Sequence, residues 1–289
     1  MAHDTRRPRG LTILPSMGIT RRHALKALVA SSVGLGTGTL AYGMAYERHD
    51  LRLVNVTLPV TGLPVALDGL RIGLITDIHH SEVVPAADVS RAVALLQDSR
   101  PEMIVLGGDY VSFGDQRYVE PVAELLAPLA EAPYGSFAVL GNHDDDREMP
   151  AALHQRGFAV LRDQRTRLEI RGETVDLAGL RFWTRRPADL ARILGDTSGT
   201  TFLLAHDPRR LTEAAAFDVQ LVLSGHTHGG QVLLPGVGAI AGRKFPVLAG
   251  TGREGNATLF VSRGVGTVYV PVRINCPPEV VLLTLQCAA

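Results

Sequence analysis

Five short apolar segments in this chain each run directly into a group of polar side chains. In chain order, the segments and the residues that follow them are Leu70–Ile75 with Asp77 and His79, Met103–Leu106 with Asp109, Phe137–Leu140 with Asn142, His143 and Asp144, Thr201–Ala205 with His206, and Leu221–Leu223 with His226 and His228. Short continuous apolar runs are typical of buried strands. Because the carboxyl ends of strands in an α/β sheet converge on the ligand-binding edge, we predict that these polar groups share one site.

Each of these motifs alone has an ordinary explanation. Asp-x-His suits a turn, Gly-Asp a helix N-cap, Asn-His-Asp a polar loop, and His-Asp-Pro a cap before a helix. It is improbable that all five motifs stand at strand ends by chance and offer only nitrogen and oxygen ligands. Imidazole, carboxylate and amide groups suit Mn, Fe or Zn, and the absence of thiolates disfavours a structural zinc site. The pattern therefore predicts a two-metal site.

The last motif, Gly225-His226-Thr227-His228-Gly229-Gly230, contains two histidines two residues apart. In extended backbone such residues project to the same side, so we expect both rings to aim at one point. The glycines let the backbone turn there and let other groups approach it closely. A His-x-His pair alone is weak evidence of a metal.

The charge of this 289-residue chain is unevenly placed. Residues 1–45 hold six of the 29 basic residues and one of the 29 acidic residues, so the remainder has five more acidic than basic side chains. This acidic body argues against a specific partnership with nucleic acid, because such binders carry a basic field. The only cysteines, Cys276 and Cys287, flank an apolar strand, and we expect both to be free.

Residues 46–289 read as one domain, since they contain no repeats and no linker. Further strands are expected at Leu51–Val60, Leu259–Ser262 and Glu279–Leu285, with helices at Ala86–Asp98, Tyr118–Ala130, Met149–Arg156, Ala188–Leu194 and Leu211–Ala216. Residues 158–180 suggest a β-meander, and residues 233–256 a loop rich in Gly and Pro.

Residues 1–45 resemble a twin-arginine export signal or a membrane anchor. A polar leader, residues 1–16, precedes Arg21-Arg22 and the uncharged run from Ala27 to Tyr46, and Met17 is an alternative start. The match departs from the usual pattern at Ala24, where Phe is common, and an ordinary amphipathic helix is the alternative. Gly43-Met44-Ala45 is a passable cleavage site, so a cleaved signal and a retained anchor both stay open. We expect an exported protein, periplasmic or membrane-anchored, that uses the twin-arginine machinery.

Taken together, the motifs between residues 70 and 231 resemble those of the calcineurin-like metallophosphoesterase superfamily. The leader, Gly229-Gly230-Gln231, and Arg273 with Pro277-Pro278-Glu279 are similar to the YkuE/YaeI-like branch of exported or membrane-associated phosphodiesterases. The resemblance implies an α/β (α+β) fold, a four-layer α/β/β/α sandwich. Two packed mixed β-sheets would carry helices outside and metals at the carboxyl ends of the strands.

The resemblance also implies two divalent metal ions, Mn, Fe or Zn. It assigns one metal to Asp77, His79, Asp109 and His228, and the other to Asp109, Asn142, His206 and His226, with Asp109 bridging. A metal-bridging hydroxide would then attack the phosphorus. His143, which follows a ligand, would act as general acid or charge stabiliser, and Asp144 is a candidate to orient it.

The implied substrate is a phosphodiester or phospholipid-like small molecule, cleaved at a phosphodiester or pyrophosphate bond. Two alternatives are a lipid pyrophosphatase similar to UDP-2,3-diacylglucosamine hydrolases and an inactive, membrane-tethered metal-binding module. His80, Arg243 and Lys244 are weaker candidates for substrate contacts, and Arg273 with Glu279 is expected to form a structural ion pair. The sequence does not indicate an oligomeric state.

Overall fold

The computed structural model describes residues 21–197 and 199–288, so the predicted polar leader and Met17 lie outside the described residues. The described residues divide into two units, one that ends at Thr39 and one that begins at Leu40. Helix α1 (Arg21–Ala45) contains the paired arginines and the uncharged run except its last residue, Tyr46. None of the helices within the described residues is both long and apolar enough to cross a membrane.

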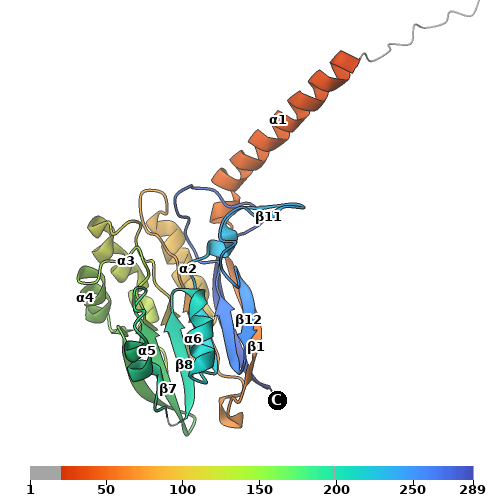
Figure 1. Cartoon of the computed structure of the whole chain (residues 1–289). Coiled ribbons are helices and arrows are strands. Elements are labelled where there is room, and N and C mark those ends of the chain that lie inside the picture. Colours follow the sequence, from red (N-terminus) through yellow and green to blue (C-terminus); the bar gives the residue numbers. More distant parts are fainter. Residues whose placement is uncertain (1–20, 198, 289) are drawn as a thin grey trace, which may run out of the picture. The chain divides into compact units, whose positions relative to one another are not determined.

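Two six-stranded mixed sheets form the framework of the second unit (Figure 1). The first sheet has the order β1 (Arg52–Thr61), β14 (Glu279–Ala288), β2 (Arg71–Ile75), β3 (Met103–Leu106), β4 (Ser136–Ala138), β5 (Ala159–Val160). The second has the order β12 (Gly250–Glu254), β13 (Ala257–Val261), β9 (Leu221–Ser224), β8 (Thr200–Ala205), β7 (Glu173–Leu180), β6 (Gln164–Ile170). Strands β2, β3 and β4 run parallel to one another, as do β8 and β9.

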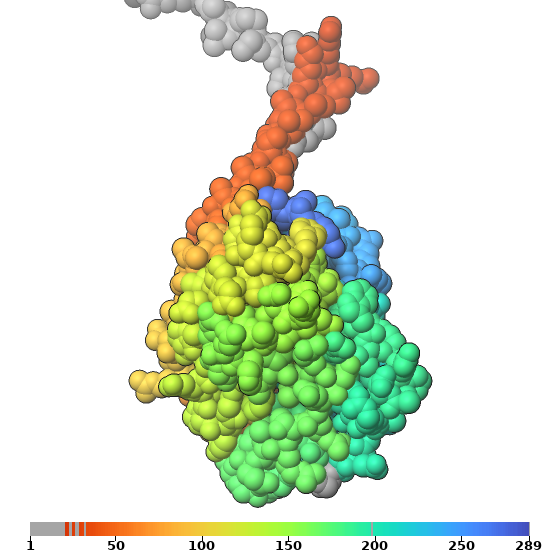
Figure 2. Space-filling model, turned by 90° about the vertical axis from the view of Figure 1, so that its left-hand side faces the viewer, coloured from red at the N-terminus to blue at the C-terminus, as the bar shows by residue number. Residues whose placement is uncertain are grey.

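Three hydrophobic clusters define four layers. The central cluster joins the inner faces of the two sheets, with Ile72 and Phe137 from the first sheet and Phe202 and Leu223 from the second. A second cluster packs α2 (Ala86–Asp98), α3 (Val119–Leu126) and α4 (Glu148–Gln155) on the first sheet, and a third packs α5 (Pro187–Leu194) and α6 (Leu211–Ala216) on the second. The predicted α/β/β/α sandwich is confirmed. In Figure 2 its yellow-to-green and teal segments cover one face side by side.

Three sequence predictions were wrong in part. Residues 158–180 are not one meander, because β5 pairs with β4 in the first sheet while β6 and β7 form a hairpin in the second. The expected loop at 233–256 contains the short pair β10 (Leu233–Leu234) and β11 (Gly238–Ala239), and also β12. The helix expected at Tyr118–Ala130 ends at Leu126 and continues as a 3-10 turn, since Pro128 has no N–H for a helical hydrogen bond.

Candidate metal centre

The five predicted strand ends meet at the seam between the two sheets. Their side chains form two groups, within each of which the ligand atoms lie within 4.8 Å of one another. The first group is Asp77, His79 and His228, and the second is Asp109, His206 and His226. Every one of these residues except His226, which is half-buried, is buried. Each group combines residues that follow strands of the first sheet with histidines that follow strands of the second.

Asp109 lies between the two groups. Its Oδ2 is 3.1 Å from His206 Nε2 in the second group and 3.6 Å from His79 Nε2 in the first. The first group is closed by His228, whose Nε2 lies 3.1 Å from His79 Nε2 and 3.4 Å from Asp77 Oδ1. A single carboxylate within reach of both groups is the geometry that a bridging ligand requires.

Several buried ligand atoms have no hydrogen-bond partner, which fits a pair of cations. The Nδ1–H of His206 donates to the carbonyl oxygen of Gly107 at 2.8 Å, so its Nε2 turns a lone pair toward Asp109. Two facing lone pairs at this distance are stable only with a proton or cation between them. The Oδ1 of Asn142 is also buried without a partner. Because buried polar atoms are normally hydrogen-bonded, we conclude that these residues fit divalent metals.

The electrostatics of the pocket favour positive charge at its centre. Burial lowers the pKa of His79 and of His226 to about 4, so both imidazoles are neutral and free to ligate at neutral pH. Burial alone would also lower the pKa of His206, but the carboxylates of Asp109 and Asp77 raise it to about 10. With protein groups alone, a proton therefore occupies the position that a cation would take.

Two motif glycines are required for close packing against the ligands. A Cβ atom at Gly225 would lie 2.1 Å from Oδ2 of Asp77, and one at Gly141 would lie 2.0 Å from Oδ1 of Asp109. Both separations are far inside van der Waals contact, so no side chain can be accommodated without moving a carboxylate. These glycines fix the ligand carboxylates rather than only allowing a turn.

The backbone at the ligands is unusual. Asp77, His79, Asp109, His226 and His228 all have φ between 51° and 73°, a region that non-glycine residues rarely adopt. The expectation that His226 and His228 aim at one point from extended backbone was wrong, because the strand ends at Ser224 and the two rings join different groups. The left-handed backbone at both residues turns each ring toward its own group.

His143 lies beside the first group and is not part of either. Its ring is half-buried, 4.9 Å from the ring of His79, and its Nδ1 accepts a 3.0 Å hydrogen bond from the backbone N–H of Phe113. Asp144 does not orient this ring. Its carboxylate accepts hydrogen bonds from the backbone N–H groups of Asp109, Tyr110 and Gly141 and so holds the ligand loops together.

The weaker candidates lie outside the ligand groups. His80 is buried, with its Nδ1 2.9 Å from the carbonyl oxygen of Val84, and has a structural role. Arg243 donates to the carbonyl oxygen of Ala239, and the Lys244 ammonium lies 5.3 Å from the ring centre of Phe245.

Arg273 and Glu279 do not pair with each other as expected. Glu279 forms its ion pair with Arg263 instead. The fully buried Arg273 guanidinium donates to the carbonyl oxygens of Arg263, Gly264, Gly266 and Cys276. Both residues are therefore structural: Arg273 holds together the loop that packs Gly264 against Asp77.

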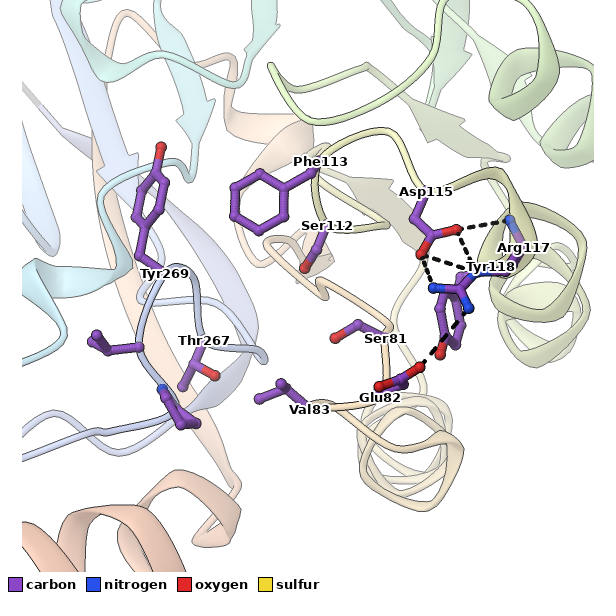
Figure 3. A pocket seen from close by; sticks show the side chains of 12 residues that line it. Ser81, Glu82, Val83, Ser112, Phe113, Asp115, Arg117, Tyr118, Thr267 and Tyr269 are labelled. Carbon is purple, nitrogen blue, oxygen red and sulfur yellow. Dashed lines mark hydrogen bonds and ion pairs between the residues drawn. The ribbon is translucent and has the colours of Figure 1, made fainter.

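Sequence reasoning did not find a groove of about 510 Å³ beside His143 (Figure 3). Three loops line it, with the residues Ser81, Glu82, Val83, Ser112, Phe113, Asp115, Arg117, Tyr118, Thr267, Tyr269, Val270 and Pro271. Figure 3 shows the Phe113 and Tyr269 rings on one side and the ion-paired Asp115, Arg117 and Glu82 on the other. The only trace of the groove in the sequence is the presence of aromatic residues in loops. This feature is too common to predict a binding site.

Comparison with known proteins supports the resemblance that the motifs suggested. The family profile described as calcineurin-like phosphoesterase matches residues 70–230. The chain is 29% identical over 282 residues to the uncharacterized metallophosphoesterase YkuE of Bacillus subtilis strain 168, covering 93% of this chain and 98% of that protein. It is 33% identical over 231 residues to the phosphodiesterase YaeI of Escherichia coli K12, covering 74% and 82%. An uncharacterized metallophosphoesterase of Aquifex aeolicus VF5 is 32% identical over 253 residues, covering 83% and 94%.

Proposed function

This chain belongs to the calcineurin-like phosphoesterase family, and from that premise we propose that it is a phosphodiesterase that works with two divalent cations. The observation that carries the proposal is the position of Asp109 between two ligand groups. Asp77, His79, Asp109 and His228 would hold one cation, and Asp109, Asn142, His206 and His226 the other. The nitrogen and oxygen donors suit Mn, Fe or Zn.

Two cations held in this way lower the pKa of a water molecule and neutralise the phosphate oxygens. Backbone groups of the chain hold the ligand carboxylates in place. Asp77 accepts the backbone N–H of His226 at 2.9 Å, and Asp109 accepts that of His143 at 2.8 Å. Each carboxylate therefore has a fixed position before substrate arrives, and such preorganisation is the main source of electrostatic catalysis.

His143 would act on the substrate through its Nε2. Since Nδ1 accepts the N–H of Phe113, the ring is neutral and its proton lies on Nε2. Burial lowers the pKa of His143, which favours the same neutral form. Of the two roles expected for this residue, the structure supports a hydrogen-bond donor that stabilises charge on the phosphoryl or leaving oxygen over a general acid.

The type of bond that is cleaved and the cellular location of the protein are further parts of the proposal. The name of the similar YaeI protein supports a phosphodiester, and a pyrophosphate in a phospholipid-like molecule has the same reacting group.

The Arg21-Arg22 pair and the uncharged run after it support export by the twin-arginine machinery, with membrane association through the N-terminal segment. Replacing both arginines with lysine should leave the protein in the cytoplasm; unchanged export would contradict this part.

The test uses the purified full-length chain loaded with Mn²⁺, Fe²⁺ or Zn²⁺. Bound metal is counted per chain, and hydrolysis of bis-p-nitrophenyl phosphate is measured beside that of p-nitrophenyl phosphate. About two metals with turnover of the diester are expected. Turnover of the monoester alone would indicate a phosphomonoesterase, and fewer than two metals under every condition would contradict the binuclear site.

A further inference from the structure

The groove beside the metal centre begins at His143. Phe113 links the two, because its N–H binds the imidazole and its ring lies 5.0 Å from that of His143. On the opposite loop, the Tyr269 ring lies 5.7 Å from Phe113 and 6.1 Å from His143. Ser112 reaches the first ligand group, with its Oγ 3.4 Å from His79 Nδ1. The groove therefore adjoins the metal centre on the side where His143 lies.

The charged side chains of the groove sum to one negative charge. The Arg117 guanidinium is paired with Asp115 at 2.7 Å and lies 3.8 Å from Glu82, so one cation faces two carboxylates. Among the described residues, Arg117 is the only Lys or Arg that lines the groove. A second phosphate or another anionic group would meet no unpaired cation there, which disfavours a nucleotide in this position.

The apolar side of the groove is exposed to solvent. Phe113 and Tyr269 are 67% and 79% exposed, and the neighbouring Val270 and Val83 are 51% and 42% exposed. Clusters of large exposed apolar side chains in a concave site of this volume commonly mark a place where an apolar ligand binds. In Figure 3 the two aromatic rings face the same open space.

We propose that this groove binds an uncharged apolar or aromatic substituent of the phosphate, and that this substituent is the leaving group. The inference rests on the proposed function. Hydrolysis adds one water across a P–O bond: the oxygen of the water stays on phosphorus, and the departing oxygen takes the bonding electron pair and a proton. His143, at the mouth of the groove, donates its hydrogen bond to that departing oxygen. Phe113 and Tyr269 determine which alcohol departs.

The first experiment measures binding without turnover. Isothermal titration of the metal-loaded full-length protein compares n-octylphosphonate, kept below its micelle concentration, with methylphosphonate; neither can be hydrolysed. The octyl compound should bind on the order of 10² times more tightly, which corresponds to about four buried methylenes. Phe113→Ala and Tyr269→Ala should each reduce this advantage at least about fivefold, and Phe113→Leu should restore most of it.

The matched controls are Val65→Ala and Val237→Ala, which remove exposed apolar side chains outside the groove. They should leave the advantage unchanged. The groove assignment would be overturned if the tighter binding of the octyl compound survived both aromatic substitutions or fell equally in the controls. The octyl group would then bind elsewhere on the protein.

The second experiment identifies the leaving group. Methyl octyl phosphate can yield octanol with methyl phosphate, or methanol with octyl phosphate, and mass spectrometry distinguishes the two pairs. Octanol should dominate in the wild type, and the Phe113→Ala and Tyr269→Ala variants should release relatively more methanol, with KM rising more than kcat falls. Methanol as the main product would overturn the leaving-group assignment. Absence of diester turnover, with binding still dependent on the groove, would contradict the proposed function and leave the apolar binding site in place.

Discussion

The backbone N–H of Phe113 donates a 3.0 Å hydrogen bond to Nδ1 of His143 and thereby fixes which ring nitrogen carries the proton. A loop of the apolar groove thus selects the tautomer of a histidine that lies beside the first ligand group. Because the donor is a backbone group, substitution of the Phe113 side chain leaves this control intact.

Replacing His143 with Ala should slow turnover without loss of metal. The ring lies outside both ligand groups, so two metals should remain, and loss of one hydrogen-bond donor to developing charge typically costs about 10²–10³-fold in kcat. Metal analysis and steady-state kinetics on the diester check both statements. A variant that retains only one metal would show that His143 is a ligand.

The pH dependence should distinguish the two roles of His143. Burial lowers its pKa, so the neutral, donating form is complete above the ordinary value near 6.5 and is lost only in acid. The measurement compares kcat as a function of pH in the wild type and in His143→Gln. We expect kcat of the wild type, but not of the variant, to decline below pH 6, and we expect no decline in either between pH 7 and 9. A decline on the alkaline side that disappears in the Gln variant would identify a general acid instead.

Asp109→Asn should lower the affinity for both metals at once, because one oxygen of Asp109 faces both ligand groups. We expect fewer than two metals per chain and loss of most activity. The exposed Asp98, at the end of α2, supplies the control, and Asp98→Asn should change neither quantity. An Asp109→Asn protein with two metals and normal turnover would refute the bridging role.

Gly225→Ala should displace the carboxylate of Asp77, since the new methyl group would lie 2.1 Å from Oδ2. Overpacking of this kind costs about 1–3 kcal/mol, and the displaced ligand should also lower the affinity for metal. Gly36→Ala is the control, because a Cβ at this position of α1 has nothing within 4 Å. Thermal unfolding and metal titration measure the two effects; normal values for both would show that the loop can move aside.

Arg273→Met should destabilise the protein rather than abolish chemistry directly. The substitution removes the side-chain donor to the carbonyl oxygens of Arg263, Gly266 and Cys276, and each unsatisfied buried group costs about 1–3 kcal/mol. Denaturant unfolding should therefore show a loss of several kcal/mol. Normal stability with turnover abolished would instead indicate that Arg273 acts on substrate.

The sequence predicted the five strands that lead into the site, because each contains a continuous apolar run, and β3, α2 and α6 have the bounds that the pattern indicated. The ligand types could be named because the polar groups follow those strands directly. The distribution of strands between two sheets could not be predicted. Strand β5 is only two residues long, and β12, Gly-Thr-Gly-Arg-Glu, has no apolar alternation to mark it.

Other features depend on contacts that local sequence does not encode. The left-handed backbone at His226 and His228 is imposed by tertiary packing, so a rule for extended chains misplaced their rings. Arg263 has no motif that marks it as the partner of Glu279. The groove is formed by three loops from residues 81–83, 112–118 and 267–271, which are separated by up to about 190 positions in the chain.

The division of the ligands between the sheets has a consequence for how the protein matures. Asp77, His79, Asp109 and Asn142 follow strands of one sheet, and His206, His226 and His228 follow strands of the other, so neither half of the sandwich contains a complete set for either cation. If these residues hold the cations as proposed, we expect metal uptake to follow docking of the sheets. Metal content should therefore report on the core between the sheets, to which Phe137 and Phe202 both contribute, and a substitution in that core should empty the site before the chain unfolds.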